Sequence, residues 1–241
     1  ICYESRIADI NLDESILQQI DEKYWELSQE AEEYNIERSK RELSKMEELL
    51  GAPEIIDDIC TDIVHHYEDN RAHELSGKAM IVAYSRPIAI KMYEKILELR
   101  PKWDEKVKVV MSGSNKDPEE WFEIIGDKSY KKELEKKFKD DEDPMKIAIV
   151  VDMWLTGFDV PSLSTMYVYK PMRGHNLMQA IARVNRVFKG KEGGLIVDYI
   201  GIASELKKAM SEYTDRDKKK YGDPDVDKVA YPKFQEKLEI C

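Results

Sequence analysis

The stretch Ile147-Ala-Ile-Val-Val151 is a continuous apolar run of strand length, and a second run at 165–169 follows it after a short connection. Runs that are apolar at every position are typical of strands buried on both faces of a parallel sheet. Three similar runs lie at 79–84, 107–111 and 194–198. Helices are expected between and after these runs: at 87–99, from beyond Pro118 through Lys139, around 179–186 and at 202–213. Strands that alternate with helices predict an α/β fold with a mostly parallel sheet and helices on both faces.

The first third of the chain has the pattern of helices instead. Apolar residues recur there at intervals of three or four, and acidic residues fill the other positions. The pattern is interrupted at Gly51-Ala-Pro53, where glycine and proline end one helix and proline opens the next. We therefore expect a helical extension at 1–76, an α/β domain at 77–213, and a linker with the start of a truncated helical region at 214–241. The chain begins at Ile1, and we expect it to be a piece of a longer protein.

Composition excludes several classes of protein and site. No apolar run approaches the roughly 20 residues that a membrane span needs, so we expect a cytoplasmic protein without a membrane partner. Cys2, Cys60 and Cys241 are odd in number and far apart, which argues against a disulfide framework or a zinc site. His65 and His66 are adjacent, and neighbouring residues on a helix point in different directions. These features predict surface histidines and no metal site.

The net charge of −11 disfavours a nucleic-acid binder, but the charge is unevenly distributed. Residues 1–76 carry 21 Asp and Glu against 7 Lys and Arg, whereas residues 77–241 carry 28 against 31. The second part can therefore present a local basic groove. The lysines between 128 and 139 alternate with glutamates, which favours a solvated helical face over a DNA-binding ridge.

Two motifs in the α/β domain carry candidate chemistry. Gln179-Ala-Ile-Ala-Arg183-Val-Asn-Arg186 sets two arginines three residues apart on one face of an expected helix, where both can bind one phosphate chain. An arginine pair that bridges acidic side chains would show the same spacing. In Thr156-Gly157-Phe158-Asp159, the glycine permits a tight turn and a close approach of the backbone to a ligand. The alternative is a plain turn in which Asp159 caps backbone amides.

Polar residues also follow the first two strands of this domain. Ser85-Arg86 comes after the first strand and Ser112-Gly113 after the second. Active groups in parallel sheets gather at the carboxyl ends of the strands, where we also expect the arginines. Hydroxyls, glycine amides and one arginine suit contact with phosphates regardless of base sequence. Alternatively, a serine at a helix start is a cap.

Three of these segments resemble helicase motifs IV, V and VI of superfamily 2 motors, in that order: Gly77–Arg86, Leu155–Asp159 and Gln179–Arg186. Tyr3–Arg6 and Leu49–Pro53 resemble the region between motifs III and IV in the R (motor) subunit of type I restriction-modification enzymes. The resemblance extends from residue 3 to about residue 213. It implies the second RecA-like lobe of an ATP-dependent DNA translocase.

The resemblance also implies a role for each motif residue. In these motors ATP and Mg²⁺ bind between two lobes, and the first lobe supplies the phosphate loop and the Mg²⁺ ligands. Arg186 would be the arginine finger at the γ-phosphate, Arg183 would bind neighbouring phosphate oxygens, and Asp159 the ribose. Gln179 and Gly157 would complete the nucleotide side. The DNA strand would be contacted by Ser85, Arg86, Ser112, Gly113 and Thr156. The family has glycine where Ala182 stands.

Several expected parts of such a motor have no counterpart in the sequence. There is no Gly-x-x-x-x-Gly-Lys-[Ser/Thr] loop and no convincing nuclease carboxylate cluster. Asp152 and Asp198 each follow an apolar run as magnesium-binding carboxylates do, but without a phosphate loop upstream they are interpreted as strand-end caps. We therefore expect the isolated chain to be inactive and to bind no nucleotide or metal.

By the same resemblance, the expected partners are the first RecA-like lobe and the nuclease domain of the same subunit, the modification and specificity subunits, and duplex DNA. Two alternatives remain open. The chain could be the second lobe of another superfamily 2 DNA or RNA helicase, or a non-catalytic doubly wound binding module.

Overall fold

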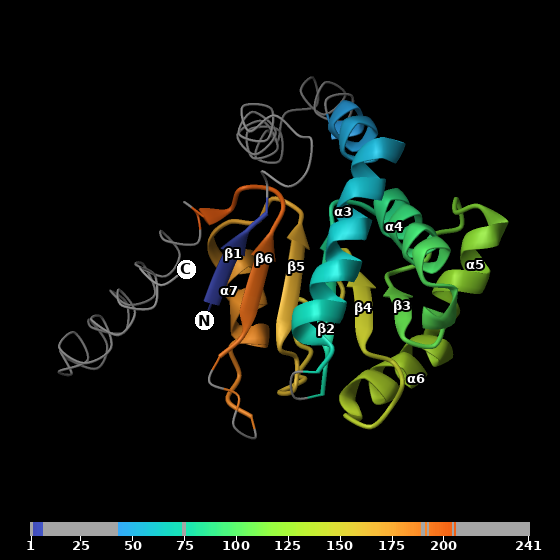
Figure 1. The fold of residues 1–241 in the computed structure, drawn as a ribbon. Coiled ribbons are helices and arrows are strands. Elements are labelled where there is room, and N and C mark those ends of the chain that lie inside the picture. Colours follow the sequence, from blue (N-terminus) through green and yellow to red (C-terminus); the bar gives the residue numbers. More distant parts are fainter. Residues whose placement is uncertain are drawn as a thin grey trace.

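Six parallel strands form one sheet in the computed structural model, whose described residues are 2–6, 43–73, 76–188, 191, 193–203 and 205 (Figure 1). The strands are β1 (Cys2–Ser5), β2 (Ala79–Ala83), β3 (Val107–Val110), β4 (Ile147–Val150), β5 (Thr165–Tyr169) and β6 (Leu195–Asp198). Their order is β1-β6-β5-β2-β4-β3, and every neighbouring pair is parallel. Ala79, the first residue of β2, is opposite Ile147 of β4 and Thr165 of β5, so the first residues of the three central strands are in register.

The five strands predicted from apolar runs are confirmed. β2, β4 and β5 are buried at every position, as expected for strands covered on both faces. β1 was not predicted, because Cys-Tyr-Glu-Ser is short and has no apolar pattern. It pairs with β6 from Cys2 opposite Leu195 to Ser5 opposite Asp198. The first segment of the chain is therefore not purely helical.

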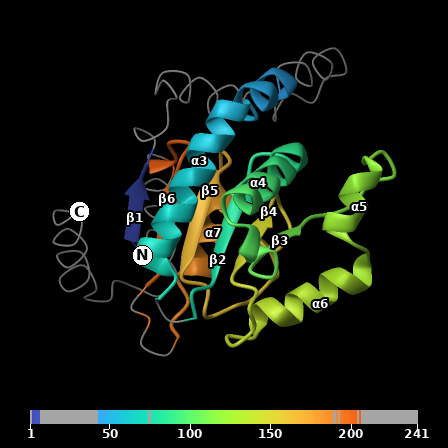
Figure 2. The same ribbon diagram turned by 45° about the vertical axis from the view of Figure 1, so that its right-hand side comes forward.

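Helices cover both faces of the sheet, so the predicted α/β class is confirmed. Figures 1 and 2 show α3 (Pro53–His66) and α4 (Arg86–Leu99) on one face and α7 (Gly174–Val184) on the other. The helices α5 (Glu119–Ile125) and α6 (Lys128–Lys139) lie on the β3 side of the sheet. Two short turns, η2 (Tyr67–Arg71) and η3 (Pro101–Trp103), follow α3 and α4.

The described parts of residues 1–76 belong to the same core as the sheet. The helix over 43–50 ends at Gly51, and Pro53 is the first residue of α3, as predicted. Leu50, Ile59 and Ile63 are fully buried in the cluster that contains the central strands. The domain boundary after residue 76 stays a prediction, and the expected helix over 202–213 and the segment 214–241 lie largely or wholly outside the described residues.

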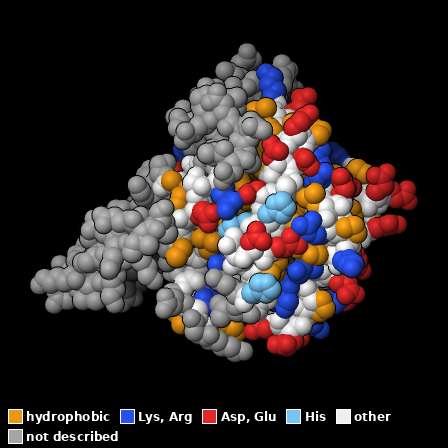
Figure 3. Space-filling model, viewed as in Figure 1, with side chains coloured by type: hydrophobic (Ala, Val, Ile, Leu, Met, Phe, Trp, Pro, Cys, Tyr) orange, Lys and Arg blue, Asp and Glu red, His pale blue; other side chains and the backbone are white. Residues whose placement is uncertain are grey.

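The surface over α3 and α4 carries acidic and basic side chains side by side, without one continuous basic patch (Figure 3). On α6, Lys137 pairs with Glu133 at 2.8 Å and Lys139 with Glu135 at 2.5 Å. The predicted solvated face of this helix is confirmed. Among the described residues, no helix has the length and apolar character needed to cross a membrane.

Candidate functional site

The helix that carries the arginine motif ends earlier than expected. Residue Arg183 lies in the last turn of α7, but the helix ends at Val184 and Arg186 lies beyond it. The expectation that both arginines share one helical face is therefore wrong. A Cβ on Gly194 would lie 2.0 Å from Val184 Cγ1, so the chain entering β6 packs directly against the end of the helix. The chain must turn away at this point.

Both arginines contact the loop that follows β4. Arg183 Nε donates to the Leu155 carbonyl oxygen at 3.4 Å, and Arg186 Nε lies 3.3 Å from Asp159 Oδ1. The Arg186 and Asp159 side chains are 50% and 51% exposed. An ion pair this exposed contributes little to stability. An anion that binds Arg186 more tightly can therefore displace the Asp159 carboxylate. Asp159 is paired with an arginine here, in place of the amide cap considered as an alternative.

The backbone of this loop is open at its glycine. Gly157 has φ +68°, a conformation that favours glycine, and a Cβ there would meet no atom within 4 Å. Thr156 and Gly157 are both exposed. The glycine is therefore required by the backbone angle, and the space beside it is free for a ligand.

Gln179 contacts a residue that the sequence did not single out. Its Nε2 lies 2.6 Å from Nε2 of His175, one turn earlier on α7. The Oε1 atom of Gln179 is buried and has no hydrogen-bond partner among the described residues. A buried acceptor without a donor is a position where a ligand donor fits. The spacing of four residues on one helix was the signal that could have identified His175.

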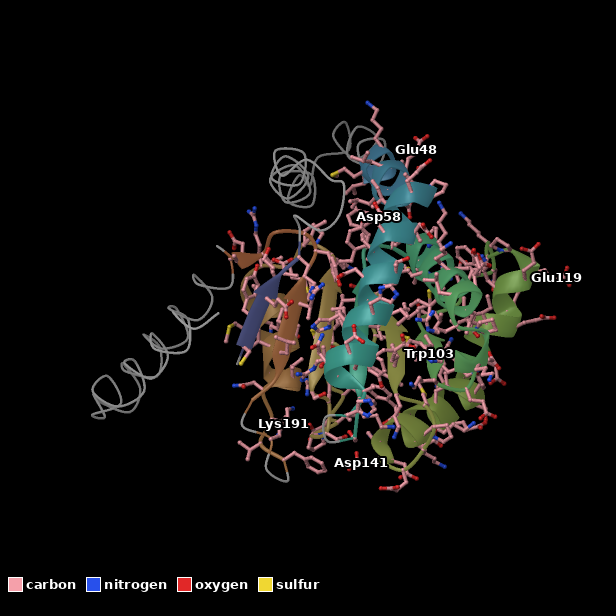
Figure 4. All side chains as sticks on the ribbon, in the orientation of Figure 1. Glu48, Asp58, Trp103, Glu119, Asp141 and Lys191 are labelled. Carbon is pink, nitrogen blue, oxygen red and sulfur yellow. The ribbon has the colours of Figure 1, made fainter. Side chains whose placement is uncertain are left out.

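The other predicted site residues lie elsewhere. Ser85, Arg86, Ser112 and Gly113 follow β2 and β3 at the carboxyl ends of the strands. Because α7 runs from β5 back to Gly194, which precedes β6, Arg183 and Arg186 lie near the amino ends of the strands. Lys191 lies at the same end of the sheet (Figure 4). The expectation that all active groups gather at the carboxyl edge is wrong for the arginines. Thr156 lies next to Leu155 and so belongs with the arginine group.

Ser85 and Arg86 already have partners within the chain. Ser85 is the N-cap of α4 and accepts from Ile88 N at 3.5 Å, which is the alternative considered above. The Arg86 guanidinium pairs with Asp117, and this hydrogen bond lowers the pKa of the Asp117 carboxyl. Asp117 also accepts from Ser114 N at 2.6 Å. Ser112 and Gly113 are exposed.

The two aspartates at strand ends have different partners. The Asp198 carboxylate accepts from Ile200 N and Ile202 N at 2.8 and 2.7 Å and from the Tyr3 hydroxyl, which confirms a cap. Asp152 forms an ion pair with Lys170 at 2.6 Å, and the cap predicted for it stays a prediction. Among the described residues, no group of three or more His, Cys, Asp or Glu side chains is placed to hold a metal ion.

The prediction of surface histidines is correct for His65 and wrong for His66. His66 is buried because it lies on the face of α3 that packs on the sheet, and its Nδ1 is 2.9 Å from the Tyr167 hydroxyl. Burial lowers the pKa of His66. Cys2 and Cys60 are free thiols, and Cys241 lies outside the described residues.

Comparisons with known proteins identify the family. A family model described as "Type I restriction enzyme subunit R domain 3" matches residues 104–201. The HindI type I restriction enzyme endonuclease subunit of Haemophilus influenzae is 45% identical over 213 residues, which cover 85% of this chain and 20% of that protein. The MjaIXP endonuclease subunit of Methanocaldococcus jannaschii is 44% identical over 222 residues, covering 91% and 21%.

A solved structure agrees with the fold. A fragment of an HsdR subunit of a type I restriction enzyme from Vibrio vulnificus superposes with a TM-score of 0.50 at 14% identity, covering 85% of this chain and 33% of that one. The chain spans about a fifth of the length of the curated relatives it matches. The fold is of the RecA-like α/β class, and from its sequence the chain belongs to the family of type I restriction enzyme endonuclease (R) subunits.

Proposed function

We propose that the chain is the second RecA-like lobe of the ATP-driven DNA translocase of a type I restriction enzyme, and that it supplies the arginine half of the ATP site. The observation that carries this proposal is the arrangement at the end of α7. There, Arg183 and Arg186 meet the loop that holds Asp159, at an exposed position. Mg²⁺ and the phosphate loop would be contributed by the first lobe.

The residues present fit a nucleoside triphosphate. Two guanidinium groups offer charge-assisted donors to phosphate oxygens, and neither is buried. The Gly157 backbone is open to a ligand, and Gln179 Oε1 lacks a donor among the described residues. Bound ATP supplies the phosphoanhydride whose cleavage drives translocation.

The half-exposed ion pair supports a simple exchange. When the two lobes close, Arg186 exchanges the Asp159 carboxylate for γ-phosphate oxygens, and Asp159 becomes free to bind the ribose. Arg183, held on the Leu155 carbonyl, binds the neighbouring phosphate oxygens. After hydrolysis Arg186 loses its phosphate partner and returns to Asp159, so the lobes separate and step along the duplex.

The carboxyl edge of the sheet supports the second half of the proposal, a track for duplex DNA. Ser112 and Gly113 are exposed there and offer a hydroxyl and a backbone amide to phosphates. Arg86 contributes only if it exchanges Asp117 for a phosphate. The nuclease domain and the modification and specificity subunits are proposed partners, because the curated relatives are endonuclease subunits of type I restriction enzymes.

The decisive experiment replaces Arg186 with alanine in the full-length subunit assembled with its partners. We expect the kcat of ATP hydrolysis to fall by roughly 10³-fold or more, as for loss of an arginine finger. Arg100→Ala is the matched control, because Arg100 is also a partly exposed arginine in an ion pair, with Glu68 at 2.7 Å. Duplex DNA should stimulate ATP hydrolysis by the wild type more than single-stranded RNA does. The isolated chain should hydrolyse no ATP. Hydrolysis by Arg186→Ala at the rate of the control would refute the proposal.

A further inference from the structure

The loop after β4 contains an unusual backbone conformation. Trp154 has φ +67°, and it is the only non-glycine residue with a positive φ in the described part of the chain. For a bulky side chain this conformation is sterically unfavourable and rare. Such a residue persists only where its surroundings hold it, and these positions cluster at functional sites.

A stack of three aromatic rings holds Trp154. The Trp154 and Phe158 rings are parallel within 6°, with centroids 4.1 Å apart. Phe138, from the last turn of α6, stacks on Trp154 at 5.4 Å and lies 6.3 Å from Phe158. All three side chains are buried. The stack therefore fixes both ends of the segment 154–158 against α6.

The α6 end of the stack is itself anchored. Lys78 Nζ lies 5.4 Å from the Phe138 ring centroid and donates to the carbonyl oxygens of Met145 and Lys137. Lys139 Nζ lies 5.2 Å from the Phe158 ring centroid. The stack is thus attached through Lys78 to the residues that precede β2 and β4.

Each stacked residue of the loop is followed directly by a contact to an arginine. Leu155, next to Trp154, supplies the carbonyl oxygen that accepts from Arg183. Asp159, next to Phe158, pairs with Arg186. Thr156 and Gly157, which lie between Trp154 and Phe158 in the sequence, are exposed and do not belong to the buried stack. The position of the loop relative to both arginines therefore depends on the two rings.

We propose that Trp154 is a positioning residue for the arginines: its left-handed backbone and its place in the stack set the Leu155 carbonyl and the Asp159 carboxylate where Arg183 and Arg186 meet them. The inference rests on the proposed function of those arginines. A tryptophan that only filled the core would contribute to stability and leave the loop geometry unchanged.

The test compares two buried tryptophans in the full-length subunit. Trp103, labelled in Figure 4, is buried to the same degree and packs edge-to-face on Tyr67 at 5.6 Å, whereas Trp154 stacks on Phe138 and Phe158. Trp154→Leu should lower the kcat of ATP hydrolysis by roughly ten- to a hundredfold, the effect expected for misplacement by about 1 Å. Trp103→Leu, measured at the same fraction of folded protein, should stay within about twofold of wild type, and Trp154→Phe should restore most of the activity.

A second measurement is independent of activity. In the absence of nucleotide, amide hydrogen exchange of residues 155–159 should become faster in Trp154→Leu and remain unchanged in Trp103→Leu. Equal kcat and equal exchange in the two leucine variants would overturn the inference. Arg186→Ala in the same assay separates the two ideas. If Arg186→Ala is inactive while the two leucine variants have equal kcat and equal exchange, only the positioning role of Trp154 is refuted. If Arg186→Ala is active, the proposed function is refuted.

Discussion

The buried side chain of Lys78 joins segments that are far apart in the sequence. Lys78 is fully buried and its Nζ donates to the Met145 carbonyl at 2.5 Å and to Lys137 at 3.3 Å. Burial lowers the pKa of Lys78 to about 8. A neutral amine still donates both hydrogen bonds, so deprotonation removes the cost of the buried charge and keeps the contacts.

This depressed pKa predicts a specific dependence on pH. Between about pH 8 and the ordinary lysine pKa, the unfolded chain binds a proton at Lys78 that the folded chain has released. The free energy of unfolding of the wild type should therefore rise with pH relative to Lys78→Met across this window. Urea unfolding of both proteins at pH 7, 8, 9 and 10 measures the difference.

Lys95 provides the control for this experiment. It pairs with Asp57 at 2.5 Å and with Glu98 at 3.0 Å, and these hydrogen bonds raise the pKa of Lys95. Its stabilising contribution is therefore lost only above the ordinary lysine pKa, outside the window. The difference between wild type and Lys95→Met should stay flat from pH 8 to 10. A flat difference for Lys78→Met as well would contradict the expected titration.

The sequence motifs could single out the candidate site residues, but they could not predict the contacts that these residues make. Arg183, Arg186 and Asp159 stand in ordered motifs, and the structure brings them together. The position of Arg186 beyond α7 depends on how closely Gly194 packs on Val184. That contact joins segments whose packing no local pattern encodes, so the sequence predicted one continuous helical face.

Among the helices, α4 offers a test of whether Ser85 is a cap or a DNA contact. Asp at this position would keep the capping acceptor and add a charge that repels phosphate. We expect Ser85→Asp to retain the stability of the wild type and Ser85→Ala to lose about 0.5 kcal/mol, the low end for caps because the bond to Ile88 N is 3.5 Å long. Thermal unfolding measures both.

The same variants separate the two roles in the full-length subunit. If Ser85 serves only as a cap, Ser85→Asp should leave stimulation of ATP hydrolysis by duplex DNA unchanged. Asp127, which caps α6 by accepting from Tyr130 N at 2.7 Å, gives the matched control Asp127→Ser. Loss of DNA stimulation in Ser85→Asp alone would assign Ser85 to the DNA track.

The elements themselves were predictable to different degrees. Strands buried on both faces have continuous apolar runs in the sequence. The bounds of β2, β4 and β5 were therefore predicted to within one or two residues. In the described sheet β1 has one neighbour and only four residues, and its sequence Cys-Tyr-Glu-Ser contains no continuous apolar run. Its place in the sheet is set by contacts with distant residues, such as the Tyr3 hydroxyl with Asp198.

Across the whole fold, a polar cluster ties β1 to α3 and to the residue after β6. Arg6 contacts Glu4 at 2.7 Å and Asp62 at 2.5 Å, and Asp62 also accepts from the Tyr199 hydroxyl at 2.5 Å. Arg6 and Asp62 are mostly buried, with side chains 21% and 19% exposed. Removing one partner leaves a carboxylate poorly solvated and incompletely paired.

Arg6→Met should therefore lower the free energy of unfolding by about 1–3 kcal/mol. The double variant Arg6→Met, Asp62→Asn should recover part of this loss, because it also removes the unpaired charge. Lys137→Met, which breaks an exposed pair with Glu133, should change stability by less than about 1 kcal/mol. Urea unfolding measures all three, and equal losses for Arg6→Met and Lys137→Met would show that the cluster does not hold β1.

The strand order has a consequence for how the chain is made. β1 is translated first, yet its hydrogen-bonded neighbour in the described sheet is β6, which is translated about 190 residues later. At typical speeds of synthesis, β1 leaves the ribosome roughly 10 to 40 s before its partner exists. Throughout that interval the pairing of β1 with β6 cannot form, so this part of the described sheet is completed only after residues 195–198 have been synthesised.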